Sequence, residues 1–163
     1  MLGDILLLLF IIPLSFFLDA LAHELGHALA GRLVGLTIHQ IVIATDLRKN
    51  PVRPRFTAFG VDFYLAPNSL LSYVTTSGVT FSRHPIRQII FSLAGPLCGA
   101  SLAAIFAFYS VGLTHTAAVN VIALSLFIFY FIMNLDNLRP EYQAHGIPSD
   151  GMKVLNAWRQ LRA

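Results

Sequence analysis

The chain has 163 residues, of which 56% are hydrophobic and only 12% are charged, and its net charge is +3 at pH 7. Soluble globular domains carry about 25% charged residues, so this composition, with a mean hydropathy of +0.69, argues against an ordinary soluble domain. The basic residues are few and show no nucleic-acid-binding pattern, so we expect a membrane protein with no nucleic-acid partner.

Three long apolar segments follow one another along the chain, approximately Ile5 to Gly35, Ile86 to Leu113 and Ala117 to Leu138. A helix of about 20 apolar residues crosses the hydrocarbon core of a bilayer. We therefore predict an all-α polytopic membrane protein with about three transmembrane helices. The alternative of a signal peptide cleaved after Ala22 is disfavoured, because the start of the chain has no basic residue and cleavage would remove most of the first helix.

The basic residues predict the orientation in the membrane. All 11 Lys and Arg lie at Arg32, between Arg48 and Arg87, or from Arg139 onward. Cytoplasmic loops carry the excess of Lys and Arg. We therefore expect residues 36–84 and the C-terminal tail in the cytoplasm and the N-terminus outside, in a multi-pass protein of a prokaryotic cell membrane.

The stretch 36–84 does not have a helical pattern. Thr37 to Ile43 and Phe56 to Leu65 are rich in β-branched and aromatic residues, as strands are, and a loop with Asn50-Pro51 lies between them. We predict a small membrane-associated β-hairpin or sheet on the cytoplasmic side. Two roles remain open for it: a linker with an adhesive face, or an edge strand that pairs with an extended peptide.

The last part of the chain follows the third apolar segment. An irregular linker from Glu141 to Pro148 leads to Ser149-Asp150-Gly151, and then to a short amphipathic tail. The apolar side of this tail is formed by Met152, Leu155, Trp158 and Leu161. There is no internal repeat, and we expect a single domain over residues 1–163.

The stretch His23-Glu24-Leu25-Gly26-His27 places two imidazoles and a carboxylate inside the first apolar segment. Residues four apart share a helix face, so His23 and His27 can direct two nitrogen atoms at one point. Neutral imidazole suits zinc, and Glu24 can act as the general base, as in His-Glu-x-x-His metalloproteases. A purely structural histidine pair is disfavoured, because ionisable residues inside a membrane are costly and usually mark function.

A catalytic zinc ion needs a third protein ligand and one open position. Three residues are candidates. Cys98 lies in the second apolar segment without a supporting motif, and as the single cysteine it excludes an intrachain disulfide. Asp19 lies one turn before His23 and could be a ligand or the partner of one. Asp150 lies in a non-helical stretch that could fold back toward the histidines.

These motifs, in this order, resemble those of the site-2 protease family of intramembrane zinc metalloproteases. The resemblance rests on the HELGH stretch, on Ala94-Gly95-Pro96 in the second segment, and on Asn137-Leu138-Arg139-Pro140 and Asp150-Gly151 after the third. It covers essentially the whole chain. It implies one zinc ion per chain with His23, His27 and Asp150 as ligands and Glu24 as the catalytic base.

The resemblance also implies that Asn137, and with it Asn134, helps to place the substrate or the ligand loop, and that the strand region holds the substrate in extended form. Two features depart from the family pattern. The linker between Pro140 and Asp150 is longer than the common short form, and Asp19 occupies a position that is normally apolar. The chain lacks PDZ and CBS modules, so we expect a minimal core.

The resulting prediction is an intramembrane zinc endopeptidase whose partners are a transmembrane protein or peptide substrate and the lipid bilayer. Its role would be regulated intramembrane proteolysis or the removal of signal-peptide remnants. The main alternative is a catalytically inactive membrane adaptor or chaperone of the same fold, and an intact Glu24 argues against it. A metal carrier is a third alternative, but it has no need of Glu24 beside His23.

Overall fold

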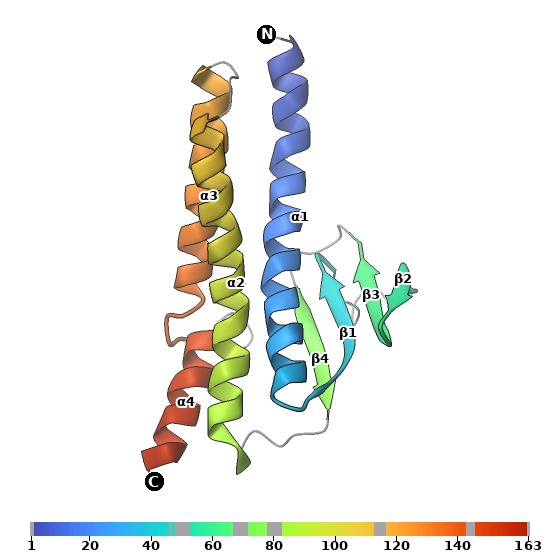
Figure 1. Ribbon diagram of the computed structural model, residues 1–163, viewed down its shortest axis with the longest axis vertical. Coiled ribbons are helices and arrows are strands. Elements are labelled where there is room, and N and C mark those ends of the chain that lie inside the picture. Colours follow the sequence, from blue (N-terminus) through green and yellow to red (C-terminus); the bar gives the residue numbers. More distant parts are fainter. Residues whose placement is uncertain are drawn as a thin grey trace.

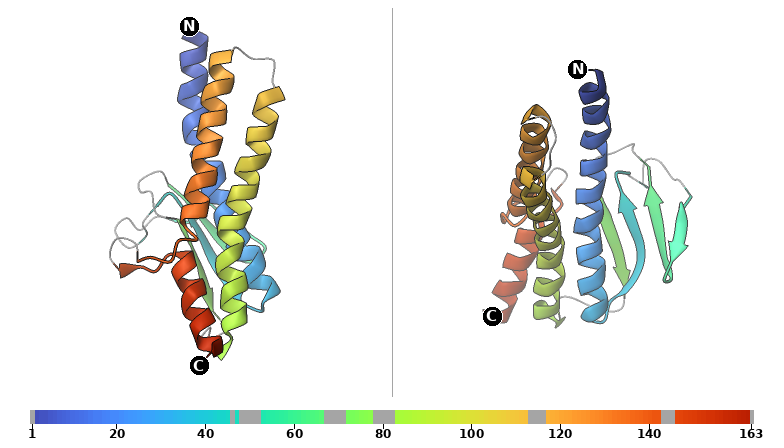
Figure 2. Two further views of the ribbon diagram at one scale, coloured as in Figure 1. Left: turned by 90° about the vertical axis from the view of Figure 1, so that its left-hand side faces the viewer. Right: turned by 45° about the horizontal axis from the view of Figure 1, so that its top comes forward.

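The structure, a computed structural model, describes residues 2–45, 47, 53–66, 72–77, 83–112, 117–142 and 146–162. Helix α1 (Leu2–Leu33) is followed by strands β1 (Thr37–Ile43), β2 (Phe56–Ala58), β3 (Val61–Leu65) and β4 (Tyr73–Ser77), and then by helices α2 (Pro85–Gly112), α3 (Ala117–Asp136) and α4 (Asp150–Arg162). Helices α1, α2 and α3 stand side by side. The sheet lies against one side of the C-terminal half of α1, and α4 packs along the N-terminal half of α2 (Figures 1 and 2).

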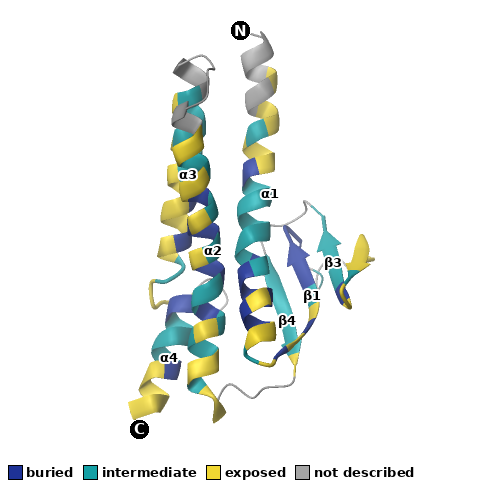
Figure 3. Cartoon of the chain, viewed as in Figure 1, coloured by how far each residue is buried: buried dark blue, intermediate teal, exposed yellow. Residues whose placement is uncertain are grey.

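The helices have the surface of membrane-embedded elements. Two of them, over Leu9–Leu33 and Pro85–Tyr109, are long and apolar enough to cross a membrane, and a shorter apolar helix covers Asn120–Asp136. Large apolar side chains face outward on these helices; Leu9 is 66% exposed and Phe108 is 79% exposed. Figure 3 shows exposed residues along α3 and along α1 beyond the sheet. The chain is thus mostly helical with two candidate membrane helices and a small sheet, whereas about three spans were predicted.

The sheet has four described strands in the order β2-β3-β1-β4, with β1 parallel to β3 and antiparallel to β4. The predicted strand Thr37 to Ile43 is β1. The predicted strand Phe56 to Leu65 is interrupted, because Phe59 (φ 52°) and Gly60 (φ 72°) form a tight turn between β2 and β3. Two consecutive left-handed residues are typical of two-residue hairpin turns. The hairpin therefore lies within the second predicted strand, and the sheet joins β1 to β3 side by side.

Strand β4 was not predicted, although its sequence, Tyr-Val-Thr-Thr-Ser, has β-branched and aromatic residues. Asn50 and Pro51 of the predicted loop lie outside the described residues.

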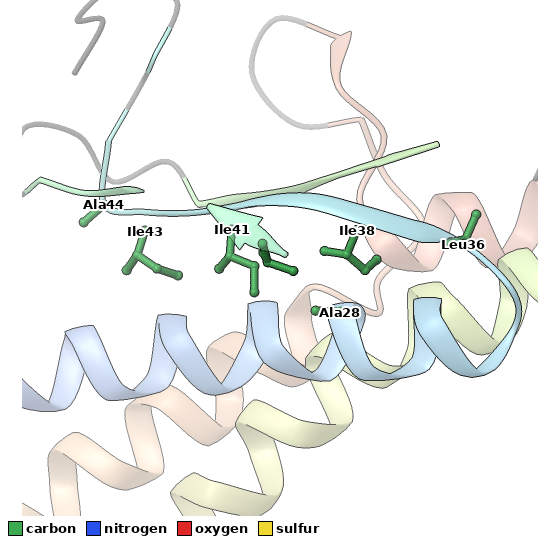
Figure 4. Packing of buried hydrophobic residues seen from close by; sticks show 7 residues of the cluster. Ala28, Leu36, Ile38, Ile41, Ile43 and Ala44 are labelled. Atoms are coloured by element: carbon green, nitrogen blue, oxygen red, sulfur yellow. The ribbon is translucent and has the colours of Figure 1, made fainter. Parts of the chain in front are cut away.

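The core lies between the sheet and α1. Ile38, Ile41 and Ile43 extend from β1 toward the face of α1 that carries Ala28 (Figure 4), and Leu36 and Ala44 belong to the same buried cluster. Strict alternation would place Ile38 and Ile41 on opposite faces of β1. The register shift between Ile38 and Gln40 adds one residue there, and both isoleucines consequently turn toward the helix. This packing fixes α1 from the sheet side.

Helices α1 and α2 approach each other closely at Gly26. A Cβ atom at this position would lie 2.5 Å from the carbonyl oxygen of Ala94 and 2.7 Å from Cβ of Cys98. Small residues allow this approach, as they do between many membrane helices. The HELGH stretch of α1 is therefore held directly against the Ala-Gly-Pro stretch of α2.

We expect Gly26→Val to separate the two helices and to lower the free energy of unfolding by about 1–3 kcal/mol, because overpacking costs that much. Thermal unfolding in detergent would measure the loss. Ala104→Val, at an exposed position of α2, is the matched control and should unfold as the wild type does. If Gly26→Val and Ala104→Val were equally stable, the close contact of α1 with α2 at Gly26 would not limit the size of the side chain there.

Candidate metal centre

Three ligand atoms from two helices meet beside α2. His23 and His27 extend from α1, and Asp150 is the first residue of α4. The Nε2 atom of His27 lies 3.2 Å from Nε2 of His23 and 3.2 Å from Oδ2 of Asp150, and His23 Nε2 lies 3.3 Å from the same oxygen. Among the described residues, these three form the group of His, Cys, Asp and Glu side chains that could hold a metal ion.

The spacing and chemistry of these atoms fit a zinc ion. Zinc bonds of about 2.0–2.1 Å in tetrahedral geometry place neighbouring ligand atoms about 3.3 Å apart. The three distances are 3.2, 3.2 and 3.3 Å. Both imidazoles use their Nδ1 atoms elsewhere, so in the neutral form each Nε2 presents a lone pair. Two lone pairs and a carboxylate oxygen repel one another unless a cation lies among them.

The ring of His27 is fixed by α2. Its Nδ1 atom donates a hydrogen bond of 2.7 Å to the carbonyl oxygen of Phe91. A carbonyl can only accept, so Nδ1 must carry the proton and Nε2 is left to bind a metal. A Cβ atom at Gly95 would overlap Nε2 of His27. The glycine of the Ala-Gly-Pro motif therefore leaves space for the ligand.

The ring of His23 is fixed by α3. Its Nδ1 atom donates to Oδ1 of Asn134 at 2.8 Å, and Asn134 Nδ2 donates to Oδ1 of Asp19 at 2.7 Å. The sequence left Asp19 as either a ligand or a partner of one. In the structure Asp19 lies two hydrogen bonds away from the ligand atoms, and neither it nor Cys98 joins the cluster.

Asp150 is oriented by a lysine that sequence reasoning missed. Lys153 Nζ donates to Oδ1 of Asp150 at 2.8 Å, which leaves Oδ2 for the histidines. Burial alone would raise the pKa of Asp150, and the charge of the Lys153 ammonium opposes this by favouring the carboxylate form. The sequence does carry one signal for this contact. Lys153 follows Asp150 by three residues in the first turn of an amphipathic helix, and this spacing places both side chains on one helix face.

The linker after α3 folds back to deliver Asp150 to the histidines. Ser149 Oγ accepts from the backbone N–H of Met152 at 3.1 Å, which caps α4, and it donates to the carbonyl of Arg139 at 2.6 Å. The N–H of Gly151 donates to the carbonyl of Asn137 at 2.9 Å. A Cβ atom at Gly151 would overlap the Leu138 carbonyl, so only glycine fits there. The longer linker therefore does not keep Asp150 from the site.

A cavity of about 700 Å³ opens beside the ligands. Glu24, which is 5% exposed, lines it next to both histidines. The predicted residues Asn134 and Asn137 also line this cavity. Other walls come from β4, α3, the segment just before α4 and the first turn of α4, with Tyr73, Val74, Phe129, Met133, Ile147 and Lys153. The arrangement combines a potential metal site, a buried carboxylate and space for a ligand or substrate.

The model of one protein family, Peptidase M50B-like, matches residues 5–139 of the chain, a range that contains His23, Glu24 and His27. Comparisons with curated proteins and with solved structures gave no match.

We expect Lys153→Met to raise the zinc dissociation constant about 10-fold, because residues that orient a ligand typically contribute 10- to 100-fold to metal affinity. Asp150→Ala should abolish tight binding altogether. Competition with a chromophoric chelator would measure both constants in detergent. Arg159→Met removes a positive charge from an exposed position of the same helix and should bind zinc as the wild type does. If Arg159→Met bound zinc as weakly as Lys153→Met does, the loss of affinity would come from the change in net charge rather than from a lost orientation of Asp150.

Proposed function

The chain belongs to the Peptidase M50B-like family, which is the site-2 protease family, and we propose that it is an intramembrane zinc endopeptidase. Its substrates would be membrane-anchored proteins, cut in or near their transmembrane segments. The observation that carries the proposal is the convergence of His23, His27 and Asp150 beside Glu24 in one cavity. Membership of this family indicates a membrane metalloprotease, and the family as a whole is generally zinc-dependent.

Zinc held by these residues would supply a Lewis acid and an activated water at neutral pH. The role of Glu24 follows from its place in the cavity. Its carboxylate adjoins His23 and His27 without entering the ligand cluster, so it can accept a proton from water and deliver it to the leaving amine. Its burial shields it from bulk solvent, which strengthens its interaction with the charges that develop there.

We place the metal centre near the cytoplasmic surface of the membrane. Backbone groups at the edges of a sheet cannot face lipid, so the sheet beside the C-terminal half of α1 belongs at or beyond the membrane surface. The C-terminal ends of α1 and α4 and the N-terminal end of α2 lie at this same end of the molecule (Figure 1). These helix ends contain Arg32, Arg159 and Arg87, and basic residues favour the cytoplasmic side. In this arrangement α1, α2 and α3 cross the bilayer, and water reaches the cavity from the cytoplasm.

We propose that β4 holds the substrate. The sequence suggested an edge within Thr37 to Leu65, but β1 has β3 on one side and β4 on the other. The described sheet ends at β2 and β4, and only β4 contributes residues, Tyr73 and Val74, to the cavity. A helical substrate must unwind before its backbone can be cut. Pairing with β4 would replace the hydrogen bonds that it loses.

The first experiment tests for cleavage. We expect Glu24→Gln to retain about one zinc ion per chain and to lose cleavage of single-span membrane substrates, because the amide cannot accept the proton from water. Metal analysis and an in vitro cleavage assay in detergent would show this. Glu141→Gln, an exposed site with the same chemical change, is the control and should cleave as the wild type does.

The proposal fails if the wild type binds no zinc. If the wild type binds zinc but cleaves no member of a substrate panel, the inactive adaptor replaces the protease as the better explanation.

The second experiment tests the role of β4. A substrate with one cysteine near its cleavage site should form a disulfide with Thr76→Cys on β4 and not with Thr57→Cys on β2. Both variants would also carry Glu24→Gln and Cys98→Ser, so that the substrate stays intact and the native thiol is absent. Thr57 is the more exposed of the two positions, so random collision alone would produce more disulfide at Thr57→Cys than at Thr76→Cys. Preferential linkage to β2 would contradict the proposal.

A further inference from the structure

We propose that Asp19 is a positioning residue for the metal centre. Acting through Asn134, it holds His23 in the tautomer with the proton on Nδ1, so that the lone pair of Nε2 is directed at the metal ion. This inference rests on the proposed zinc function and assigns a role to a residue outside the ligand cluster.

The two histidines differ in how their tautomers are fixed. The partner of His27 is the main-chain carbonyl of Phe91, which can only accept a hydrogen bond. The partner of His23 is the side-chain amide of Asn134, which carries an acceptor oxygen and a donor nitrogen. If the amide turned over, its NH₂ group would face His23 Nδ1, favour the other tautomer and place a proton on Nε2. His23 therefore needs a second residue that fixes the amide.

Asp19 supplies this constraint. Asn134 Nδ2 donates to Oδ1 of Asp19 at 2.7 Å and to the carbonyl oxygen of Tyr130 at 2.9 Å. Both partners accept only, so the two N–H bonds of the amide are used and its oxygen must face His23. Turning the amide over would set its oxygen against a carboxylate and a carbonyl. The bond to the carboxylate is charge-assisted and is the stronger of the two restraints.

The surroundings hold this chain of hydrogen bonds in place. Asn134 is 2% exposed, and a Cβ atom at Gly99 would overlap its Oδ1 atom, so α2 closes tightly over the amide. Asp19 borders the metal-site cavity on one side and an apolar cavity of about 220 Å³ between α1, α2 and α3 on the other. A carboxylate in such a place is costly, which indicates a functional role for it.

The tautomer can be measured without metal. In metal-free protein labelled with ¹⁵N-histidine, at a pH where imidazole is neutral, we expect the wild type to hold a larger share of His23 in the Nδ1–H form than Asp19→Leu does. Asp19→Leu should show a mixture of tautomers or the Nε2–H form, with His27 unchanged. Ser15→Ala, which alters the same apolar cavity without touching Asn134, should match the wild type. A substitution that acted only on stability would leave the His23 tautomer unchanged.

Zinc affinity tests the route through Asn134. We expect Asp19→Leu to raise the zinc dissociation constant about 10-fold, within the usual range for residues that orient a ligand. The same substitution in an Asn134→Leu background should change the constant by less than about twofold, because its effect passes through the amide. Asp19→Asn keeps an acceptor oxygen and should restore most of the affinity.

Each result decides the inference. An unchanged His23 tautomer, or equal zinc binding by the wild type and Asp19→Leu, overturns it and leaves the proposed function standing. A 10-fold effect of Asp19→Leu that persists without Asn134 also overturns it, since Asp19 would then act by another route. A wild type that binds no zinc refutes the proposed function and this inference together.

Discussion

Each of the three candidate metal ligands is oriented by a hydrogen bond with a neighbouring group, and the rest of the structure supports these three bonds. The partner of His27 belongs to α2, the partner of His23 belongs to α3, and the partner of Asp150 lies on α4. The histidines themselves lie on α1. All four helices are therefore needed to aim three atoms at one point, and a partner missing from any one of them would leave a ligand free to rotate.

The helices can supply these partners only because their backbones come unusually close. Glycine makes this possible at four places around the centre. Gly26 allows α1 to touch α2, and Gly95 leaves space for His27. Gly99 leaves space for Asn134, and Gly151 lets the start of α4 lie on the carbonyl of Leu138. Two of these glycines belong to the motifs HELGH and Ala-Gly-Pro. The motifs thus encode the packing of the site as well as its chemistry.

The sequence predicted what periodicity and motif spacing encode. The three apolar segments correspond closely to α1, α2 and α3, and β1 has its predicted bounds. His23 and His27 share a helix face by spacing alone, so their meeting could be foreseen. Asp150 could not be chosen over Asp19 and Cys98 by spacing, because the path of the linker depends on hydrogen bonds to backbone groups far along the chain.

Other features depend on tertiary contacts that no local pattern reveals. The carbonyl of Phe91 is a backbone atom, and any residue type could provide it. The turn at Phe59 and Gly60 divides what looks like one continuous strand, so the parallel pairing of β1 with β3 was missed. The short strand β4 is defined by its pairing with β1. Long-range pairing of this kind escapes a reading of local composition.

The position of the sheet connects the fold to the proposed cleavage of peptide bonds near lipid. Strand β1 packs on α1 around Ala28, one residue after the second histidine. Backbone edges require water or a partner strand, so in the proposed arrangement a sheet anchored at this level would bring an aqueous boundary close to the candidate ligands. The same anchoring sets β4 along the wall of the cavity that contains Glu24. Water access and a surface for extended peptide would then be two consequences of one contact, the packing of β1 on the helix that carries the histidines.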